Sequence, residues 1–270
     1  MKDFSEKVAL GRTGLQVSRL GIGSSYHVPE RACRAAFDAG VNYFFWGSVR
    51  TPGMGRALRD LAPRHRSDLV VVLQCYARLP WLMRRSVENG LRKLGLDHVD
   101  ILLLGWYDRK PGRWVRDEAQ RLKDQGKCSF IAISSHQRML FQDYMRDALY
   151  DILQVRYNAA HRGAEQEVFP HLPEEDPPGI VSFTTTRWGD LLQPDKMPPG
   201  ETPPSATDCY RFALSHPNVD VALSGPKNDK QMAEALAALE QGPLGEDEME
   251  RMRRIGDHVH AASSLFNRLR

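Results

Sequence analysis

The sequence predicts an α/β fold in which eight strand–helix units close a parallel barrel, and three observations support this. Short apolar runs alternate with longer amphipathic stretches along the chain. Several of the short runs, such as LVVVL and VDILLL, are almost wholly apolar, as expected for strands covered by helices outside and by packed side chains inside. The strand-like runs number eight and a helical pattern follows each, which is typical of a (β/α)8 TIM barrel.

Each element follows from its local pattern. The expected strands are residues 20–23, 41–45, 69–75, 99–104, 128–134, 152–155, 180–184 and 219–223. Before them, residues 6–17 form two short apolar segments around a turn at Thr13 and Gly14, which predicts a β-hairpin that closes the barrel floor. Residues 173–179 and 193–205 are predicted loops because of their proline content. The second loop follows the seventh strand on the catalytic face, so we expect it to shape a substrate pocket.

Composition limits the possible functions. The chain has 270 residues, 41% of them hydrophobic, which suits one barrel-sized domain over residues 1–270. Lys and Arg total 37 against 34 Asp and Glu, a formal charge of +3 that is too small and too diffuse for a nucleic-acid partner. We find no apolar leader and no apolar stretch of membrane-spanning length, so we expect no membrane partner and a cytoplasmic location. Four cysteines without ligand spacing predict neither a disulfide framework nor a metal site, and these are Cys33, Cys75, Cys128 and Cys209.

Several segments, in order and at suitable intervals, resemble the aldo-keto reductase superfamily nearly end to end. They are LGRTGLQVSRLGIG, AAFDAGVNYF, SVENGLRKLGLDHVDILLL, GKCSFIAISSH, QVRYNAAHR and LSHPNVDVALSGPKNDKQMAEALAAL. The resemblance implies hydride transfer between NADP(H) and a carbonyl compound. In that family a tyrosine protonates the alkoxide, a lysine paired with an aspartate lowers the pKa of the tyrosine, and a histidine orients the carbonyl.

The four residues of that catalytic tetrad are not found here. The aspartate position falls on Phe45, the tyrosine position on Arg50, the lysine position on Cys75 and the histidine position on Gly105. Moving the alignment by one residue recovers neither the lysine nor the histidine. Removing one partner of a buried ion pair leaves an uncompensated charge at a cost of roughly 3 to 5 kcal/mol. Because the aspartate and the lysine are both replaced, we interpret the change as a repacked, apolar pocket floor.

The resemblance also implies a site for NADP(H), and this part of the family pattern is retained. In SGPKNDKQMAE, a helix start beside Lys227 is a physical anion site, which would suit the 2'-phosphate of the cofactor. Gln154 stands where the family contacts the nicotinamide amide, and Phe183 replaces a stacking tyrosine. The remaining implied cofactor positions are Gly23, Ser24, Ser134, Ser135, Ser224, Gly225, Asn228, Gln231 and Glu234.

Without the tetrad, a surviving hydride transfer would need another proton donor. His136, Tyr26 and Tyr107 are the candidates, although each is equally explained as a loop residue that shapes or supports the pocket. Cys75 with Arg50 nearby is a possible nucleophile, but a lone cysteine is more often a small buried hydrophobe.

The substrate pocket is expected to be aromatic and to carry positive charge. Trp46, Tyr76 and Trp106 follow the second, third and fourth strands and would line it, unless they serve ordinary packing. Arg50 and Arg187 would meet over the pocket and select a carboxylate or phosphate, unless both are solvated surface residues. The expected ligand is therefore a small molecule, aromatic or anionic.

The favoured function is an atypical NADP-dependent oxidoreductase that reduces ordinary carbonyl compounds poorly. Loss of the general acid costs about 10² to 10⁴ in rate. Two alternatives stay open, because a fold does not fix a function. One is a catalytically inactive barrel that senses a nucleotide or binds a partner. The other is a barrel that carries out non-redox chemistry such as cyclisation or isomerisation.

Overall fold

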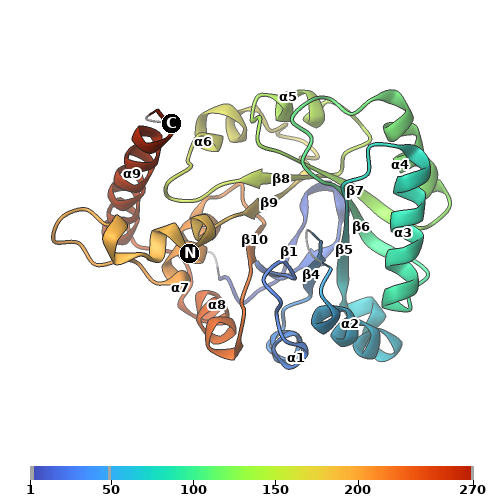
Figure 1. The fold of residues 1–270 in the computed structure, drawn as a ribbon, viewed down its shortest axis with the longest axis horizontal. Coiled ribbons are helices and arrows are strands. Elements are labelled where there is room, and N and C mark those ends of the chain that lie inside the picture. The colour runs from blue at the N-terminus through green and yellow to red at the C-terminus, as the bar shows by residue number, and fades with distance from the viewer. Residues whose placement is uncertain (1–2, 48–49, 269–270) are drawn as a thin grey trace.

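The computed structural model describes residues 3–47 and 50–268, and within them eight parallel strands close a barrel in the order β10-β3-β4-β5-β6-β7-β8-β9 (Figure 1). The strands are β3 (Leu20–Gly23), β4 (Tyr43–Trp46), β5 (Val70–Cys75), β6 (Val99–Leu104), β7 (Cys128–Ser135), β8 (Ile152–Arg156), β9 (Gly179–Phe183) and β10 (Val221–Ser224). The predicted (β/α)8 barrel is confirmed, because every neighbouring pair of strands, including β10 with β3, is parallel.

Helices cover the outside of the barrel (Figure 1). They are α1 (Glu30–Asp38), α2 (Pro52–His65), α3 (Pro80–Leu94), α4 (Arg113–Asp124), α5 (Leu140–Met145), α6 (Ala164–Glu167), α7 (Ala206–Ser215), α8 (Asp229–Gln241) and α9 (Glu246–Arg268). Short 3-10 turns are η1 (Gly11–Thr13), η2 (Arg66–Asp68), η3 (Phe169–His171), η4 (Arg187–Leu192) and η5 (Pro194–Lys196). Local sequence sets several helix ends: α2 and α3 begin with proline, and a reciprocal capping box between Ser205 and Asp208 starts α7. No described helix has the length and apolar character needed to cross a membrane.

Side chains along each strand alternate between two apolar layers. Residues such as Tyr43, Phe45 and Val72 fill the barrel interior. Their neighbours Phe44 and Trp46 pack outward in the layer shared with the helices. This alternation decides which residue at a strand end can reach the barrel mouth.

The predicted hairpin closes the bottom of the barrel. It consists of β1 (Val8–Ala9) paired antiparallel with β2 (Gln16–Val17). Leu10 and Val17 are fully buried and belong to the interior layer. Gly11 has a φ of +45°, and a Cβ there would lie 2.2 Å from the backbone nitrogen of Gly179, so glycine allows the hairpin to contact the start of β9.

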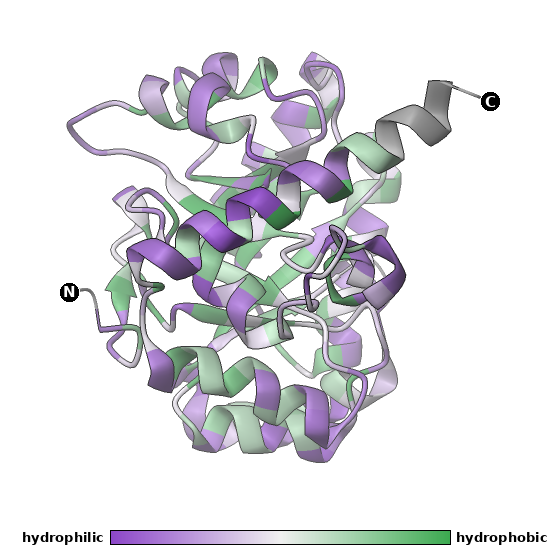
Figure 2. Cartoon of the chain, turned by 90° about the vertical axis from the view of Figure 1, so that its left-hand side faces the viewer, coloured by the Kyte–Doolittle hydropathy of each residue, from purple (hydrophilic) through white to green (hydrophobic). Residues whose placement is uncertain are grey.

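One loop prediction is wrong in its role. Residues 193–205 are largely irregular, as expected, but they pack against α9 and line neither compartment of the cleft described below. The Glu201 carboxylate forms ion pairs with the guanidinium groups of Arg251, at 3.0 Å, and Arg254, at 2.6 Å. Met197 in the same loop is buried. Figure 2 shows α9 lying obliquely across this side of the molecule with a mainly hydrophilic outer surface. The loop therefore stabilises the position of α9 through ion pairs and packing.

Candidate active site

The carboxyl ends of the parallel strands meet at one mouth, where side chains from different strands can be brought together. Counting by twos from the interior apolar residues gives the last barrel-facing position of each strand. These positions are Gly23, Phe45, Gln74, Leu103, Ser134, Phe183 and Leu223, and on β8 they are Gln154 and, one step beyond it, Arg156. Three of them, Gln74, Ser134 and Gln154, are polar although they are buried.

Two adjacent compartments form a cleft that extends from this mouth toward α8. The mouth compartment has a volume of about 370 Å³ and is lined by Gly23, Ser25, Tyr26, Phe45, Tyr76, His136, Gln154, Phe183, Thr184, Thr185, Thr186, Trp188, Tyr210, Leu223, Ser224 and Gly225. The outer compartment, of about 130 Å³, is lined by Tyr26, Thr186, Trp188, Gly189, Leu192, Ala206, Tyr210, Gly225, Pro226, Lys227, Gln231 and Glu234. The compartments are adjacent, because they share five lining residues, including Tyr26, Trp188 and Gly225.

Tyr26 and Gly225 form the junction of the two compartments. The Tyr26 ring lies against Gly225, where a Cβ would come within 2.4 Å of a ring carbon, so the absence of a side chain at Gly225 makes room for the ring. The ammonium of Lys227 lies 5.6 Å from the centroid of the same ring. Burial raises the pKa of Tyr26, so its phenol is a weaker acid than usual.

A bent loop after β9 covers the junction. Thr184, Arg187 and Trp188 have φ values of +56°, +52° and +54°, a region that non-glycine residues rarely adopt. The bend is held from both sides, since Asn158 donates to the Thr184 carbonyl at 2.8 Å and Thr185 donates to the Leu223 carbonyl at 3.0 Å. It places Trp188 beside both compartments. Sequence patterns could not indicate this loop, because no glycine marks the three positions.

The floor of the mouth is filled by two side chains that pack against two glycines. A Cβ at Gly47 would lie 2.5 Å from the Phe45 ring and 2.6 Å from Gln74. A Cβ at Gly105 would lie 2.3 Å from the Gln74 amide nitrogen. The histidine position therefore has no room for a histidine while Gln74 stands in the same space.

Two tetrad positions do not face the mouth. Cys75 belongs to the outer apolar layer, so the mouth-facing residue of this strand is Gln74 and the use of Cys75 as a pocket nucleophile is wrong. Arg50 turns outward, where it donates to the Ser86 carbonyl at 3.1 Å and hydroxyl at 3.0 Å. Phe45 does line the mouth compartment.

The predicted pair of arginines over the pocket is not formed. Arg187 is buried and donates to the Val259 carbonyl in α9 at 2.9 Å, whereas Arg50 lies against α3. Trp46 is also misassigned, because it faces the helices and its indole donates to the Thr51 carbonyl at 3.0 Å. Trp46 faces outward because it alternates with the inward-facing Phe45 on β4. Tyr76 does line the mouth compartment.

His136 projects into the mouth compartment from the end of β7. Its ring packs edgewise between Trp106, with centroids 5.4 Å apart, and Phe183, at 5.8 Å. Burial lowers the pKa of His136, and repulsion from Arg156 lowers it further against a weaker opposing effect of Asp108. The Nδ1 atom is buried without a hydrogen-bond partner among the described residues. His136 is therefore a neutral imidazole near pH 7.

Asp108 fixes the loop that carries His136. Its carboxylate accepts from the His136 backbone N–H at 2.7 Å, from the Trp106 indole at 2.6 Å and from the Ser135 hydroxyl at 3.2 Å. Burial raises the pKa of Asp108, but these hydrogen bonds outweigh it and bring the pKa below the usual value. Ser134 accepts from the Trp106 N–H at 2.9 Å. Both serines thus support the loop, and neither lines the cleft.

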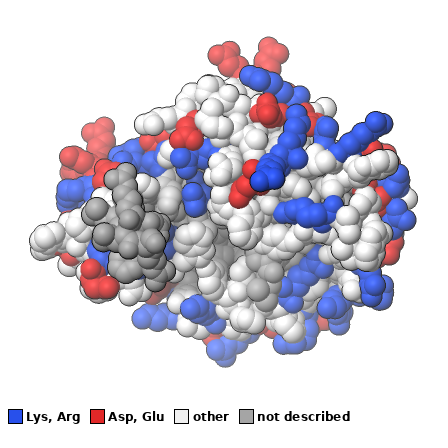
Figure 3. Space-filling model, turned by 45° about the horizontal axis from the view of Figure 1, so that its top comes forward, with Lys and Arg blue, Asp and Glu red and all other residues white. Residues whose placement is uncertain are grey.

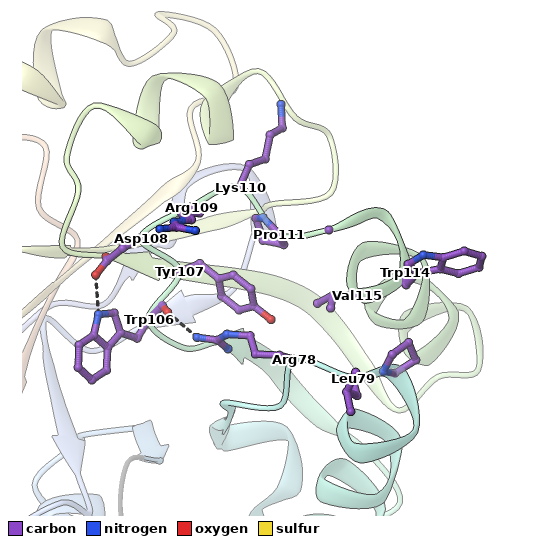
Figure 4. Close-up of a pocket in the computed structure, with 12 residues that line it drawn as sticks. Arg78, Leu79, Trp106, Tyr107, Asp108, Arg109, Lys110, Pro111, Trp114 and Val115 are labelled. Carbon is purple, nitrogen blue, oxygen red and sulfur yellow. Dashed lines mark hydrogen bonds between the residues drawn. The ribbon is translucent and has the colours of Figure 1, made fainter.

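Tyr107 points away from the mouth. Its hydroxyl donates to the Ala77 carbonyl at 3.2 Å, and the Arg78 guanidinium lies 3.7 Å from its ring centroid. Figure 4 shows both residues, with Trp106, in a separate cavity of about 790 Å³ between the starts of α3 and α4. Tyr107 is therefore removed as a proton donor. We place the active site in the smaller cleft, because only there do ends of β3, β4, β8, β9 and β10 converge.

Some of the predicted cofactor residues line the cleft and others do not. Gly23, Gln154, Phe183, Ser224, Gly225, Lys227, Gln231 and Glu234 line the cleft. Ser24 is fully buried and donates to the Gly47 carbonyl at 3.0 Å. Asn228 caps α8 by accepting from the Gln231 N–H at 2.9 Å, while Gln231 accepts from the Lys227 N–H at 2.8 Å. The start of α8 thus uses some of its own donors, and the exposed Lys227 ammonium is the main positive group there.

Figure 3 shows one face of the molecule, on which Lys and Arg side chains gather and acidic ones lie mainly toward the edge. Within the described residues, no group of three or more potential metal ligands is present. All four cysteines are buried and none forms a disulfide.

Known proteins are similar to this chain over most of its length. The model of the Aldo/keto reductase family matches residues 22–192. L-galactose dehydrogenase of Arabidopsis thaliana is 25% identical over 290 residues, covering 89% of this chain and 90% of that protein. The NADH-specific methylglyoxal reductase of Escherichia coli (strain K12) is 24% identical over 209 residues, covering 61% of this chain and 63% of that protein. The holo form of an aldo-keto reductase from Bacillus halodurans superposes with a TM-score of 0.77 at 19% identity, covering 93% of this chain and 96% of that one.

Proposed function

The chain belongs to the aldo/keto reductase family, and we propose that it is an atypical NADP(H)-dependent oxidoreductase with a non-standard active site. The observation that carries this proposal is the two-compartment cleft, which joins His136 and Gln154 at the mouth to Lys227 near α8. A cleft with two adjacent compartments suits an extended two-part ligand such as a dinucleotide.

The cleft residues fit such a cofactor. Phe183 and Gln154 offer an aromatic face and a carboxamide at the mouth, where a nicotinamide amide would be held. Gly225 makes room for the Tyr26 ring, and Lys227 supplies a positive charge for a phosphate. Bound there, NADP(H) would supply or accept a hydride. One relative is named as NADH-specific, so the preference for NADP(H) rests on Lys227 in this chain.

His136 is the proposed proton-transfer group. It is the histidine that lines the mouth compartment, and its lowered pKa keeps the imidazole unprotonated near pH 7. A neutral imidazole accepts a proton, so this site suits oxidation of an alcohol, in which the hydroxyl proton passes to His136 as the carbonyl forms. Tyr26 is the weaker candidate, because burial raises the pKa of its phenol and no described lysine pairs with its hydroxyl.

Ordinary carbonyl reduction should be slow for the same reason. Reduction needs a donor for the developing alkoxide, and the positions of the usual phenol and ammonium are Arg50, which faces α3, and Cys75, which faces the helices. A protonated His136 would be needed instead, and protonation becomes common only at acidic pH.

The test combines cofactor binding with turnover in both directions. Purified protein is titrated with NADPH and with NADH while cofactor fluorescence is recorded, and is then assayed with panels of alcohols with NADP⁺ and of aldehydes and ketones with NADPH. We expect tighter binding of NADPH, oxidation of some alcohols above pH 7, and little reduction of simple aldehydes. Failure to bind either cofactor would refute the proposal.

A second function has one observation in its favour. Phe45 and Gln74 fill the floor of the mouth, which would suit a barrel that binds a nucleotide without turnover. Saturable NADPH binding with no oxidation or reduction across both panels would favour this nucleotide-binding role over catalysis.

A further inference from the structure

Two arginines at the barrel mouth carry buried nitrogens that no partner in the described residues satisfies. The Nε atoms of Arg156 and Arg187 are both inaccessible to solvent and without a hydrogen bond. Arg187 is 7% exposed as a residue, and one of its terminal nitrogens donates to the Val259 carbonyl. Arg156 is only partly buried as a residue. The charge of Arg187 lowers the pKa of Arg156, and both guanidinium groups lower the pKa of His161, so the two charges act on one region. Buried polar groups without partners are uncommon and need an explanation.

Arg156 is the last residue of β8, at the mouth end of the barrel, although it is not one of the residues that line the mouth compartment. It lies two residues beyond Gln154 on β8 and therefore on the same barrel-facing side. Its register partner across the sheet is Phe183 on β9, which also lines the compartment. Its charge also lowers the pKa of His136, so the Arg156 charge acts on the group proposed for proton transfer.

The other charged side chains near these two arginines are either positive or already paired with other residues. Arg138 pairs with Glu167 through two hydrogen bonds of 2.9 Å, and Arg162 pairs with Asp257 at 2.7 Å. Asp190 lies 3.9 Å from Arg187 but also pairs with Lys196.

The nearby histidines cannot serve as partners that neutralise the two arginines. The His161 ring, 5.4 Å from that of His260, has a buried Nδ1 without a hydrogen-bond partner among the described residues. Burial, followed by repulsion from Arg156 and Arg187, lowers the pKa of His161 to about 3. Asp108, the acid whose charge reaches Arg156, is already engaged by three hydrogen bonds. The region therefore keeps a net positive charge, because Asp190 is shared between Arg187 and Lys196 and Asp108 is engaged by other donors.

We propose that Arg156 and Arg187 form a binding site for the carboxylate or phosphate group of a substrate, beside the mouth compartment. Planar guanidinium groups bind oxyanions with paired hydrogen bonds, and a buried site strengthens them. The substrate would then be a small alcohol or carbonyl compound that also carries an anionic group. This inference rests on the proposed function for its reacting group, but the anion site itself requires no cofactor.

The site also gives the anion a role in catalysis. An anion next to Arg156 offsets the positive charge that this residue imposes on His136, while Asp108 and the flanking rings of Trp106 and Phe183 stay unchanged. His136 then becomes a better proton acceptor when an anionic substrate is bound. A neutral alcohol lacks this effect.

The test is calorimetric titration with three probes: inorganic phosphate, benzoate, and benzamide as the uncharged isostere of benzoate. Wild-type protein and the variants Arg156→Gln, Arg113→Gln and Lys227→Gln are compared, each with and without NADP⁺. Arg113 is an exposed arginine at the start of α4 and controls for loss of one charge. Lys227→Gln separates the proposed anion site from the expected phosphate site near α8.

We expect benzoate or phosphate to bind the wild type and benzamide not to bind. Arg156→Gln should weaken binding of the anion by about 10- to 100-fold, the worth of a hydrogen bond to a charged group, whereas Arg113→Gln should leave it within about twofold. Lys227→Gln should leave benzoate binding within about twofold, and any loss of phosphate binding in this variant is assigned to the site near α8. The anion that loses more affinity in Arg156→Gln identifies the substrate group. Equal binding by Arg156→Gln and wild type, or equal binding of benzamide and benzoate, would overturn the site.

A second variant and a second binding measurement complete the test. If Arg156→Gln does not fold, Arg156→Lys keeps the charge without the planar fork and should bind the anion about tenfold more weakly than the wild type. Binding of NADP⁺ is recorded on the same samples. A protein that binds NADP⁺ but neither anion refutes this site alone, and one that binds an anion but not NADP⁺ refutes only the proposed cofactor.

Discussion

The two sides of the barrel mouth differ in how their space is used. On the β4–β6 side, Phe45 and Gln74 fill the floor against Gly47 and Gly105, so that even one added methyl group at either glycine would collide with a neighbour. On the β8–β10 side, Gln154 and the residues near it border an open cleft that continues to α8. This difference indicates that the residues at the floor of the mouth and those on the proposed cofactor side can be replaced independently within one barrel.

The largest expected effect concerns His136 on the open side. His136→Gln should lower the rate of alcohol oxidation by about 10² to 10⁴, because the hydroxyl proton then has no acceptor. Tyr26→Phe keeps the ring on Gly225 and removes only the hydroxyl, so it should change the rate by less than about fivefold, far below the loss of a general base. Steady-state rates with saturating NADP⁺ measure both. Similar rates in His136→Gln and wild type would discard the proposed base.

The next effect concerns the choice of cofactor. Lys227→Met should weaken NADPH binding by about 10- to 100-fold and leave NADH nearly unchanged, since only NADPH carries the extra phosphate. Lys230→Met, at an exposed lysine one position past the start of α8, is the matched control and should alter neither. Fluorescence titrations give all the dissociation constants. An equal loss for both cofactors would mean that Lys227 does not contact the 2'-phosphate.

The closed side should respond in stability. Gly105→Ala forces a Cβ to within 2.3 Å of the Gln74 amide, and overpacking of this kind costs about 1 to 3 kcal/mol. In a Gln74→Ala background the same change should cost much less, because the obstructing amide is gone. Urea unfolding of the four proteins provides the double-mutant cycle. Additive costs would show that Gln74 does not occupy the histidine position.

The last effect is a pH dependence of stability, which is absent near neutral pH. His161 has a folded-state pKa of about 3, below its ordinary value of 6.5, so the folded protein holds the neutral ring while the unfolded chain takes up a proton. Unfolding is therefore favoured as pH falls from 6.5 toward 3, and above 6.5 the group has no influence. His161→Gln should flatten this slope in urea titrations across that range. An unchanged slope would place the responsible group elsewhere.

Much of the fold was predictable because its signals are local. The apolar runs gave the eight strands to within a few residues, and the pair Thr13–Gly14 gave the hairpin. The bounds of the cleft were less predictable, because adjacent residues of a strand face opposite sides and a one-residue uncertainty reverses the assignment. That is why Cys75 was assigned to the pocket in place of Gln74.

Other site residues needed the tertiary structure. Arg50 follows β4 closely but turns to α3, and the sequence offers no signal for that turn. Arg156 was missed because its unsatisfied Nε is visible only once the burial and partners of its neighbours are known. Trp188 depends on left-handed backbone at non-glycine positions, which is set by hydrogen bonds from Asn158 and Thr185.

A structure of the protein crystallised with NADP⁺ tests the central claim most directly, because it examines both sides of the mouth at once. The account predicts the nicotinamide against Phe183 and Gln154, the phosphates toward Lys227, and His136 as the nearest group able to accept a proton. Finding a tyrosine, lysine and aspartate assembled around the nicotinamide from other loops would contradict it. A cleft that Tyr26 and Trp188 block, so that the cofactor cannot enter, would also contradict it.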